Sequence, residues 1–107
     1  MLEKMNEMNA LYDFYQLLLT EKQRAYFEAY YQQNLSLAEI ADAYEISRNA
    51  VHVQMKRTEA LLYDYEAKLK LLHKHLSRES SIKKIKEKIT DACVLAWLRE
   101  LEALEDE

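Results

Sequence analysis

The stretch LAEIADAYEISRNAVHVQMKRT, residues 37–58, decides the fold. Ser36 and Glu39 have the spacing of a capping box, which starts a helix, and Ser47 is a good N-cap for a second helix beginning at Arg48. Between these caps the apolar and small positions suit two crossed helices; they are Ile40, Ala41, Tyr44, Ile46 and Val51. The stretch therefore predicts a short helix, a tight turn and a longer helix, which is the helix-turn-helix geometry.

In a helix-turn-helix the first turn of the second helix is exposed and enters the major groove of a nucleic acid. Arg48 and Asn49 have side chains that can read base edges, whereas Lys56 and Arg57 suit phosphate contacts. The predicted nucleic-acid contacts are Arg48, Asn49, His52, Lys56 and Arg57. The turn between the helices carries Glu45, which must tolerate an awkward backbone conformation and brings a negative charge near any phosphate.

The flanks of this stretch predict an all-α chain. The sequence has no glycine and no proline, the residues on which tight β-hairpin turns depend. A helix is expected over residues 2–19, and Thr20 with Gln23 forms another capping box for a helix that follows. Aromatic residues at helical spacing in that helix, Phe27, Tyr30 and Tyr31, are interpreted as core and not as a base-stacking platform.

Beyond the helix-turn-helix, a seven-residue apolar repeat predicts one long helix from Ser47 to about Leu76. Its positions are Val51, Met55, Thr58, Leu62, Tyr65, Leu69, Leu72 and Leu76. Such a helix would be roughly 45 Å long, which is more than a small chain easily covers by itself. Either the last helices fold back on this seam, or part of the seam is a homodimer interface, which we favour.

A serine-rich segment, residues 77–81, is expected to break the helix, and residues 77–104 then form a C-terminal helical segment. Thr90 and Asp91 interrupt it, and the acidic end from Glu105 is expected to fray. The basic run Lys83, Lys84, Lys86 and Lys88 is interpreted as a solvated helix face, with a second phosphate-contacting patch as the alternative.

Charge is distributed unevenly along the chain. The net charge is -4, but segments 1–47, 48–88 and 89–107 sum to -5, +6 and -5. A basic middle can attract phosphate although the whole chain is acidic, because the local field decides attraction. An ordinary solvated helix face is the alternative explanation of the same charges.

The residues that catalysis or metal binding needs are sparse. His73 and His75 are two apart and point to different faces of a helix, so no metal site is expected. Cys93 lies in an apolar context and is interpreted as a buried structural thiol. Without glycine there is no phosphate-cradling loop. We therefore expect a protein that is no enzyme and has no cofactor, and, lacking a secretion signal or a long apolar run, a cytoplasmic protein without direct membrane insertion.

Three stretches carry a family resemblance: MNALYDFYQLLLTEKQ, YYQQNLSLAEIADAYEISRNAV and KRTEALLYDYEAKL. Together they resemble the YlxM family of bacterial proteins over nearly all of residues 5–76, and the central motif is similar to DNA-binding region four of sigma factors. The resemblance implies a sigma-like helix-turn-helix protein without a wing, associated with the signal recognition particle. Members often have glycine where this chain has Glu45 and an aromatic residue where it has His52.

These observations predict a single helical domain over residues 1–107, with a helix-turn-helix core at residues 20–58. The leading hypothesis is a nucleic-acid-binding regulator, whose ligand is DNA or the signal recognition particle RNA. The alternative is a protein-interaction module that docks on the particle's GTPase through the heptad helix or the acidic, leucine-rich tail. An amphipathic membrane binder is the weakest alternative, since no exposed segment sets its basic residues opposite a bulky apolar face.

Overall fold

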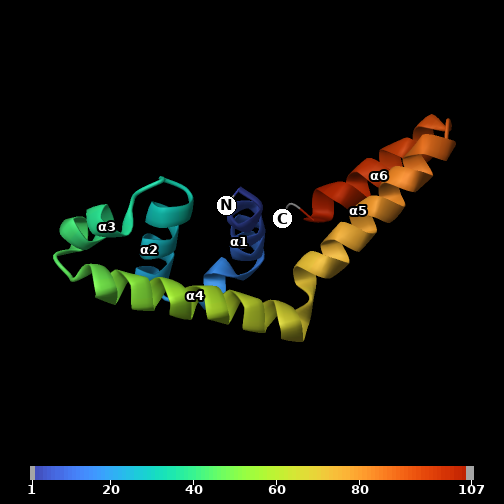
Figure 1. Ribbon diagram of the computed structural model, residues 1–107. Coiled ribbons are helices and arrows are strands. Elements are labelled where there is room, and N and C mark those ends of the chain that lie inside the picture. The colour runs from blue at the N-terminus through green and yellow to red at the C-terminus, as the bar shows by residue number, and fades with distance from the viewer. Residues whose placement is uncertain (1, 106–107) are drawn as a thin grey trace. The chain divides into compact units, whose positions relative to one another are not determined.

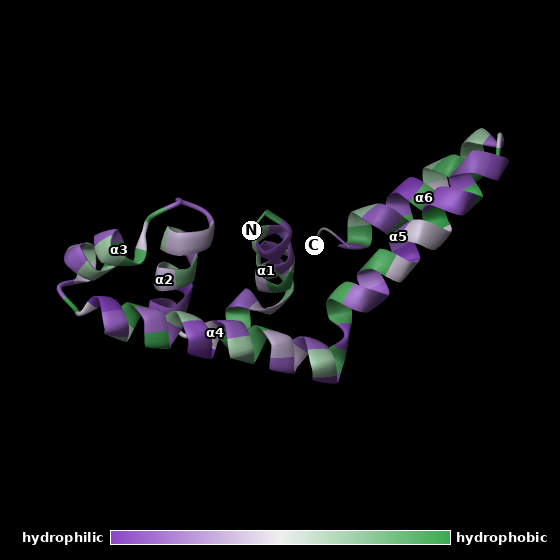
Figure 2. Cartoon of the chain, viewed as in Figure 1, coloured by the Kyte–Doolittle hydropathy of each residue, from purple (hydrophilic) through white to green (hydrophobic). Residues whose placement is uncertain are grey.

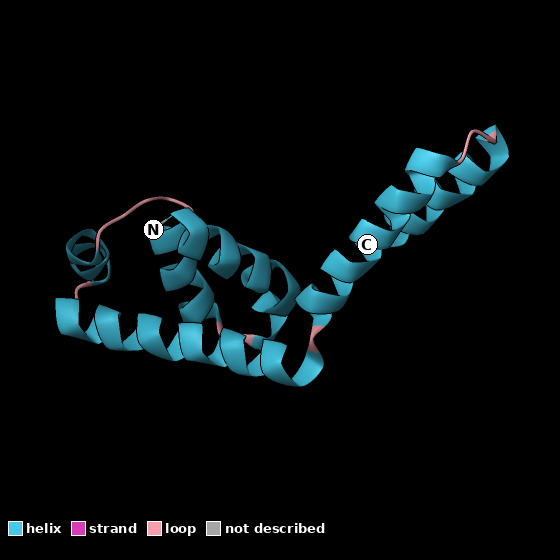
Figure 3. Ribbon diagram, turned by 45° about the vertical axis from the view of Figure 1, so that its right-hand side comes forward, coloured by secondary structure: helices cyan, strands magenta, loops and turns pink. Residues whose placement is uncertain are grey.

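A computed structural model of the chain describes residues 2–105, and every regular element among them is helical (Figure 1). The elements are α1 (Leu2–Tyr15), the 3₁₀ turn η1 (Gln16–Leu18), α2 (Glu21–Tyr31), α3 (Leu37–Tyr44), α4 (Arg48–Leu69), α5 (Leu71–Lys88) and α6 (Ala92–Glu105). The all-α prediction is confirmed, and short loops join the helices (Figure 3).

Contacts group the chain into two compact units, which divide after Leu72. The first unit holds α1 to α4, and the second holds nearly all of α5 together with α6. The single helical domain over residues 1–107 stays a prediction. It requires that both units unfold in one step. None of the helices within residues 2–105 is long and apolar enough to span a membrane.

The core of the first unit is aromatic. Helix α4 packs against α1, α2 and α3. Phe27 of α2 is fully buried, stacks on Tyr12 with ring centroids 4.4 Å apart, and lies 4.6 Å from the ring of Tyr31. Buried tyrosine hydroxyls find acceptors: Tyr12 donates to Glu28 at 2.7 Å, and burial raises the pKa of that phenol. The interpretation of the helix α2 aromatics as core is confirmed.

Local side-chain caps start the helices of the first unit. Thr20 and Gln23 exchange reciprocal bonds of 2.9 and 3.1 Å at the start of α2, and Ser36 and Glu39 do the same at α3 with 3.0 and 3.1 Å. Each satisfies backbone N–H groups that the helix itself leaves without a partner. Both predicted capping boxes are confirmed.

The prediction of one continuous helix to Leu76 is wrong, because the helix is interrupted at Lys70. Lys70 takes a left-handed conformation with φ of 55°, so α4 ends at Leu69 and α5 begins at Leu71. Tyr15 donates to the carboxylate of Glu66 at 2.7 Å and accepts the N–H of Leu71 at 3.1 Å. Glu66 also accepts the N–H of Leu72 at 3.1 Å. These bonds satisfy the first backbone donors of α5 and so stabilise the break.

The heptad seam has two different halves. Its first four positions are all buried; they are Val51, Met55, Thr58 and Leu62. Helices α1, α2 and α3 contact α4, so they cover this half of the seam. In the second half Leu69 and Leu76 are about half exposed. A homodimer through that half stays a prediction.

The second unit is a helical hairpin of α5 and α6. The expected break at residues 77–81 is wrong, since α5 continues through Ser77, Ser80 and Ser81. Serine is only mildly unfavourable inside a helix, and these serines are exposed. The predicted interruption at Thr90 and Asp91 is confirmed, and the Asp91 carboxylate accepts the N–H groups of Cys93 and Val94 at 2.8 and 3.2 Å.

Two predictions about α6 are wrong. Cys93 is exposed and not buried, because α5 does not cover its side of α6. Glu105 does not fray: it is the last residue of α6 and binds two residues of α5. The rest of the acidic end, Asp106 and Glu107, lies outside the described residues.

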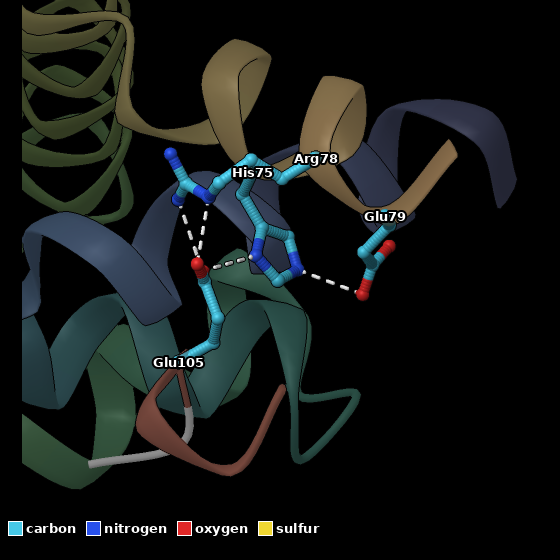
Figure 4. A network of polar contacts seen from close by, with 4 residues as sticks. All are labelled: His75, Arg78, Glu79 and Glu105. Atoms are coloured by element: carbon cyan, nitrogen blue, oxygen red, sulfur yellow. Dashed lines mark hydrogen bonds and ion pairs between the residues drawn. The ribbon is translucent and has the colours of Figure 1, made fainter. Parts of the chain in front are cut away.

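Ion pairs join the two helices of the hairpin (Figure 4). Glu105 accepts two bonds from Arg78, of 2.6 and 2.9 Å, and lies 2.9 Å from Nδ1 of His75. The other ring nitrogen of His75 lies 2.9 Å from Glu79, so both ring nitrogens have a carboxylate partner. Lys86 pairs with Glu102 further along. Arg78 and then His75 hold the pKa of Glu105 down, at about 2.

Candidate nucleic-acid interface

The start of α4 is built by the turn before it. Ser47 accepts the N–H of Ala50 at 3.0 Å, which fixes the first turn of α4 and leaves Arg48 and Asn49 exposed. Helix α3 packs against α4 through buried Ile40 and Ala41. The predicted helix-turn-helix is therefore formed, with the N-terminal turn of its second helix open to solvent. The positive end of the helix dipole adds to the attraction of this turn for anions.

The structure brings three of the five predicted contact residues together. Arg48, Asn49 and His52 line an open hollow of about 440 Å³. Its fourth wall is Leu37, the first residue of α3, which the sequence reasoning did not include. An apolar residue directly after the capping Ser36 was the available signal. A guanidinium, an amide and an imidazole thus converge beside one apolar contact, a set that suits a base edge next to a phosphate.

Lys56 and Arg57 stand apart from that group. Lys56 follows His52 by four residues, so it lies one turn further along the same side of α4. Arg57 is exposed but turned by about 100° from Lys56 around the helix, because each residue of an α-helix advances by that angle. The five side chains therefore do not share one surface.

A buried carboxylate that sequence reasoning missed weakens Lys56 as a phosphate contact. Glu59 is only 7% exposed, and its carboxylate lies 2.9 Å from the ammonium of Lys4 and 3.9 Å from that of Lys56. The hydrogen bond to Glu59 raises the pKa of Lys4. Burial, followed by the charge of Glu59, raises the pKa of Tyr31. Lys4 is thus the main partner of Glu59. The negative charge of Glu59 also offsets part of the positive charge of Lys56, which lies further away.

The turn itself is as awkward as its sequence predicts. Glu45 has φ of 55° and ψ of 44°, the left-handed region that favours glycine. Its N–H bonds to the carbonyls of Ala41 and Asp42, and the N–H of Ile46 bonds to Ala41, which closes the end of α3. Asp42 and Glu45 are both exposed. The turn therefore places negative charge between α3 and the start of α4, close in sequence to Arg48.

Comparison with known proteins places this architecture in a family. A family model named UPF0122 and described as "Putative helix-turn-helix protein, YlxM / p13 like" matches residues 2–97. The chain belongs to this family. The UPF0122 match reaches from α1 into α6, beyond residues 5–76 on which the resemblance rested. The resemblance to the YlxM family is thereby confirmed.

Individual UPF0122 relatives match over most of their length. A UPF0122 protein of Geobacillus kaustophilus is 50% identical over 98% of this chain and 100% of its own. One from Bacillus pumilus is 50% identical over 96% of this chain and 91% of its own. One from Bacillus cereus is 52% identical over 85% of this chain and 83% of its own.

Proposed function

We propose that this protein is a nucleic-acid-binding regulator that uses the first turn of α4 as its contact surface. The observation that carries the proposal is the hollow at the start of α4, which Arg48, Asn49 and His52 line together with Leu37. Lys56 and Arg57 add flanking phosphate contacts, on two different sides of the helix. The all-helical UPF0122 architecture and the absence of a glycine loop in the sequence favour binding over catalysis.

We further propose that the protein acts in the signal recognition particle pathway in the cytoplasm, with the RNA of that particle as ligand. This step rests on the YlxM resemblance. Phosphate and shape contacts suffice for the recognition of a structured RNA. The acidic turn at Asp42 and Glu45 disfavours a long backbone contact along this turn, in RNA as in DNA.

The alternative is docking on the GTPase of the particle without nucleic-acid contact. The specific observation in its favour is the apolar surface of α6, where Trp97, Leu101 and Leu104 are each more than half exposed. Large exposed apolar side chains in one place usually mark a protein contact.

Fluorescence anisotropy at two salt concentrations separates these functions. The purified protein is titrated against the particle RNA, random duplex DNA and the GTPase. Phosphate contacts predict that the logarithm of the binding constant falls with the logarithm of salt concentration, by about 0.9 for each duplex phosphate neutralised. An apolar protein interface barely responds to salt.

Matched variants assign the contact. Arg48→Ala with His52→Ala removes the hollow's cationic and imidazole groups, and we expect a loss of RNA affinity of about tenfold or more. Lys22→Ala with Lys68→Ala, at exposed sites elsewhere, is the control and keeps binding. Salt-sensitive binding that both pairs of changes leave intact would reject α4 as the contact surface. Binding to the GTPase alone would favour the docking function.

A further inference from the structure

Helix α6 carries more apolar surface than α5 covers. Trp97, Leu101 and Leu104 follow one another at spacings of four and three residues, so they share one side of the helix. Their exposed fractions are 64, 51 and 63%. Val94, Leu95 and Leu98, at the other apolar positions of α6, are half-buried. Apolar bands run along α6 in Figure 2.

Helix α5 extends this apolar surface on the same side of the hairpin. Leu101 and Ile82 line a hollow of about 250 Å³ together with Ser77, Arg78 and Ser81 of α5. Ile85 lies one turn beyond Ser81 and is 42% exposed. We call Ile85, Trp97, Leu101 and Leu104 the hairpin apolar face. The other side of Ile82 is polar, lined by Glu79, Lys83, Lys86 and Glu102.

A hairpin of this size does not stabilise itself. Ile82 is the only hydrophobic side chain that is buried among residues 73–105. Units below about 40 residues usually need disulfides, a metal or association with another surface. Cys93 is a free thiol, and no cluster of metal-ligating side chains occurs among residues 2–105. Association of the hairpin apolar face with another surface would bury apolar area that the hairpin by itself leaves exposed.

The charge along the hairpin favours a second copy of this chain, in antiparallel orientation. On both helices near the turn, residues 80–98 carry four lysines, one glutamate and one aspartate, a net charge of +2. Near the open end, residues 71–79 and 99–105 together carry one lysine, two arginines and four glutamates, a net charge of -1. Antiparallel pairing places the basic end of one hairpin beside the acidic end of its partner, while parallel pairing places like charges together. The charge pattern is thus complementary to itself under a two-fold axis.

The apolar positions match under the same operation. At about 1.5 Å per residue, a two-fold axis near the middle of the hairpin sets Leu104 of one copy opposite Ile85 of the other. It also brings Trp97 of one copy toward Leu101 and the serine-lined hollow of the other. The small side chains of Ser77 and Ser81 leave room there for an indole ring.

We propose that the hairpin apolar face is a homodimer interface, in which two α5–α6 hairpins pair antiparallel into a four-helix bundle. This interface differs from the α4 seam that the heptad predicts, whose first half is already inside the first unit. The proposal does not depend on nucleic-acid binding. A dimer held in this way carries two helix-turn-helix units.

Trp97 reports directly on this interface because it is the single tryptophan of the chain. The full-length protein is diluted from high to low micromolar concentration under reducing conditions, which keeps Cys93 from forming a disulfide link. Sedimentation equilibrium gives the mass, and tryptophan emission gives the exposure of the indole. We expect a dimer with blue-shifted emission that becomes a monomer with red-shifted emission on dilution, with the same midpoint.

Two neighbouring substitutions test the face itself. Leu104→Glu inserts a charge into the interface and is expected to raise the dimer dissociation constant by at least about 30-fold. Ala103→Glu adds the same charge one residue earlier, on a different side of α6, and is expected to leave the constant within about threefold. Far-UV circular dichroism of both variants verifies that the helices remain. Equal weakening by both variants would overturn the assignment of the face.

Two other results would also overturn the proposal. Blue-shifted emission in a protein that is monomeric at every concentration would mean that the chain's own first unit covers Trp97. Red-shifted emission in a protein that stays monomeric at high concentration would mean that no second copy covers this face.

Discussion

The two units of this chain use different interactions to hold their helices. In the first unit, fourteen hydrophobic side chains form a buried cluster, in which the ring of Phe27 lies within 5 Å of the rings of Tyr12 and Tyr31. In the hairpin, one hydrophobic side chain is buried and the helices are joined by the ion pairs of Glu105 and Glu102. Surface ion pairs contribute about 0 to 1 kcal/mol each, whereas a buried aromatic ring contributes several times that.

This difference teaches where stability and assembly reside. A unit with its own core can hold a turn in place, as the first unit does for the turn before α4. A unit without one depends on whatever covers its apolar side.

The aromatic residues also separate the units for measurement, since all eight tyrosines lie between residues 12 and 65 and the tryptophan lies at residue 97.

The largest effect is expected from Phe27→Ala in the core of the first unit. The ring is fully buried and packs on Tyr12 and Tyr31, so its removal should lower the free energy of unfolding by about 3 to 5 kcal/mol. Urea unfolding followed by tyrosine near-UV circular dichroism measures this. Leu101→Ala in the hairpin is the comparison and should change the tyrosine transition by less than about 0.5 kcal/mol. Similar losses in both variants would contradict the contrast between the units.

The next largest effect is expected at the junction of α4 and α5. Tyr15→Phe removes the hydroxyl that bonds Glu66 and the N–H of Leu71, and should cost about 1 to 2 kcal/mol. Hydrogen exchange at the Leu71 amide should accelerate. Tyr65→Phe removes a longer bond, of 3.5 Å to the carbonyl of Leu18, and serves as the control with a smaller effect. Unchanged exchange at Leu71 in the Tyr15 variant would show that the break at Lys70 has another cause.

Glu45→Gly is expected to stabilise the first unit by about 1 kcal/mol, because glycine adopts the left-handed conformation without the steric cost of a Cβ. Glu45→Gln keeps that cost and should leave the free energy of unfolding nearly unchanged. Both variants remove the negative charge, so both should strengthen RNA binding to a similar extent at low salt. Stabilisation by glutamine would point to charge repulsion instead of backbone strain.

The smallest effect is expected from pH in the hairpin. The bond to Glu105, together with the charge of Glu79, raises the pKa of His75 above its ordinary 6.5. A raised pKa means that this pair stabilises the folded hairpin below pH 6.5 and that the contribution is lost as pH rises through the folded pKa. Glu105, with a pKa of about 2, keeps its contribution above its ordinary pKa of 4.5 and loses it only as pH falls toward 2.

The hairpin should therefore be most stable at mildly acidic pH, between these two limits. An NMR titration of the His75 ring in the wild type and in Glu105→Gln measures the shift. The pKa of His75 should fall in the variant. A pKa that does not change would mean that the pair with Glu105 is not formed in solution.

The helix starts could be predicted because their signals are local. Thr20 with Gln23, Ser36 with Glu39, and Ser47 before Arg48 act over three residues of sequence, and each was found at the expected place. The left-handed turn at Glu45 could be anticipated for the same reason. Of the candidate site, Arg48, Asn49 and His52 could be grouped from helical spacing alone.

What failed depended on contacts between distant residues. The heptad predicted one helix through Lys70, and the break there is held by Tyr15, which lies 51 residues before Glu66 and 56 before Leu71. Glu59 near Lys56 was missed because its main partner, Lys4, belongs to α1. The exposure of Cys93 depended on which side of α6 the other helix covers.

The sequence by itself determined the helical class, the caps, the aromatic core and the helix-turn-helix, because each follows from backbone preferences and side-chain spacing within a few turns. Only the tertiary structure decided where α4 ends and which cationic side chains lie beside a carboxylate. It also decided which apolar side chains of the hairpin are exposed. These outcomes arise from hydrogen bonds and ion pairs between helices, whose partners the order of residues does not specify.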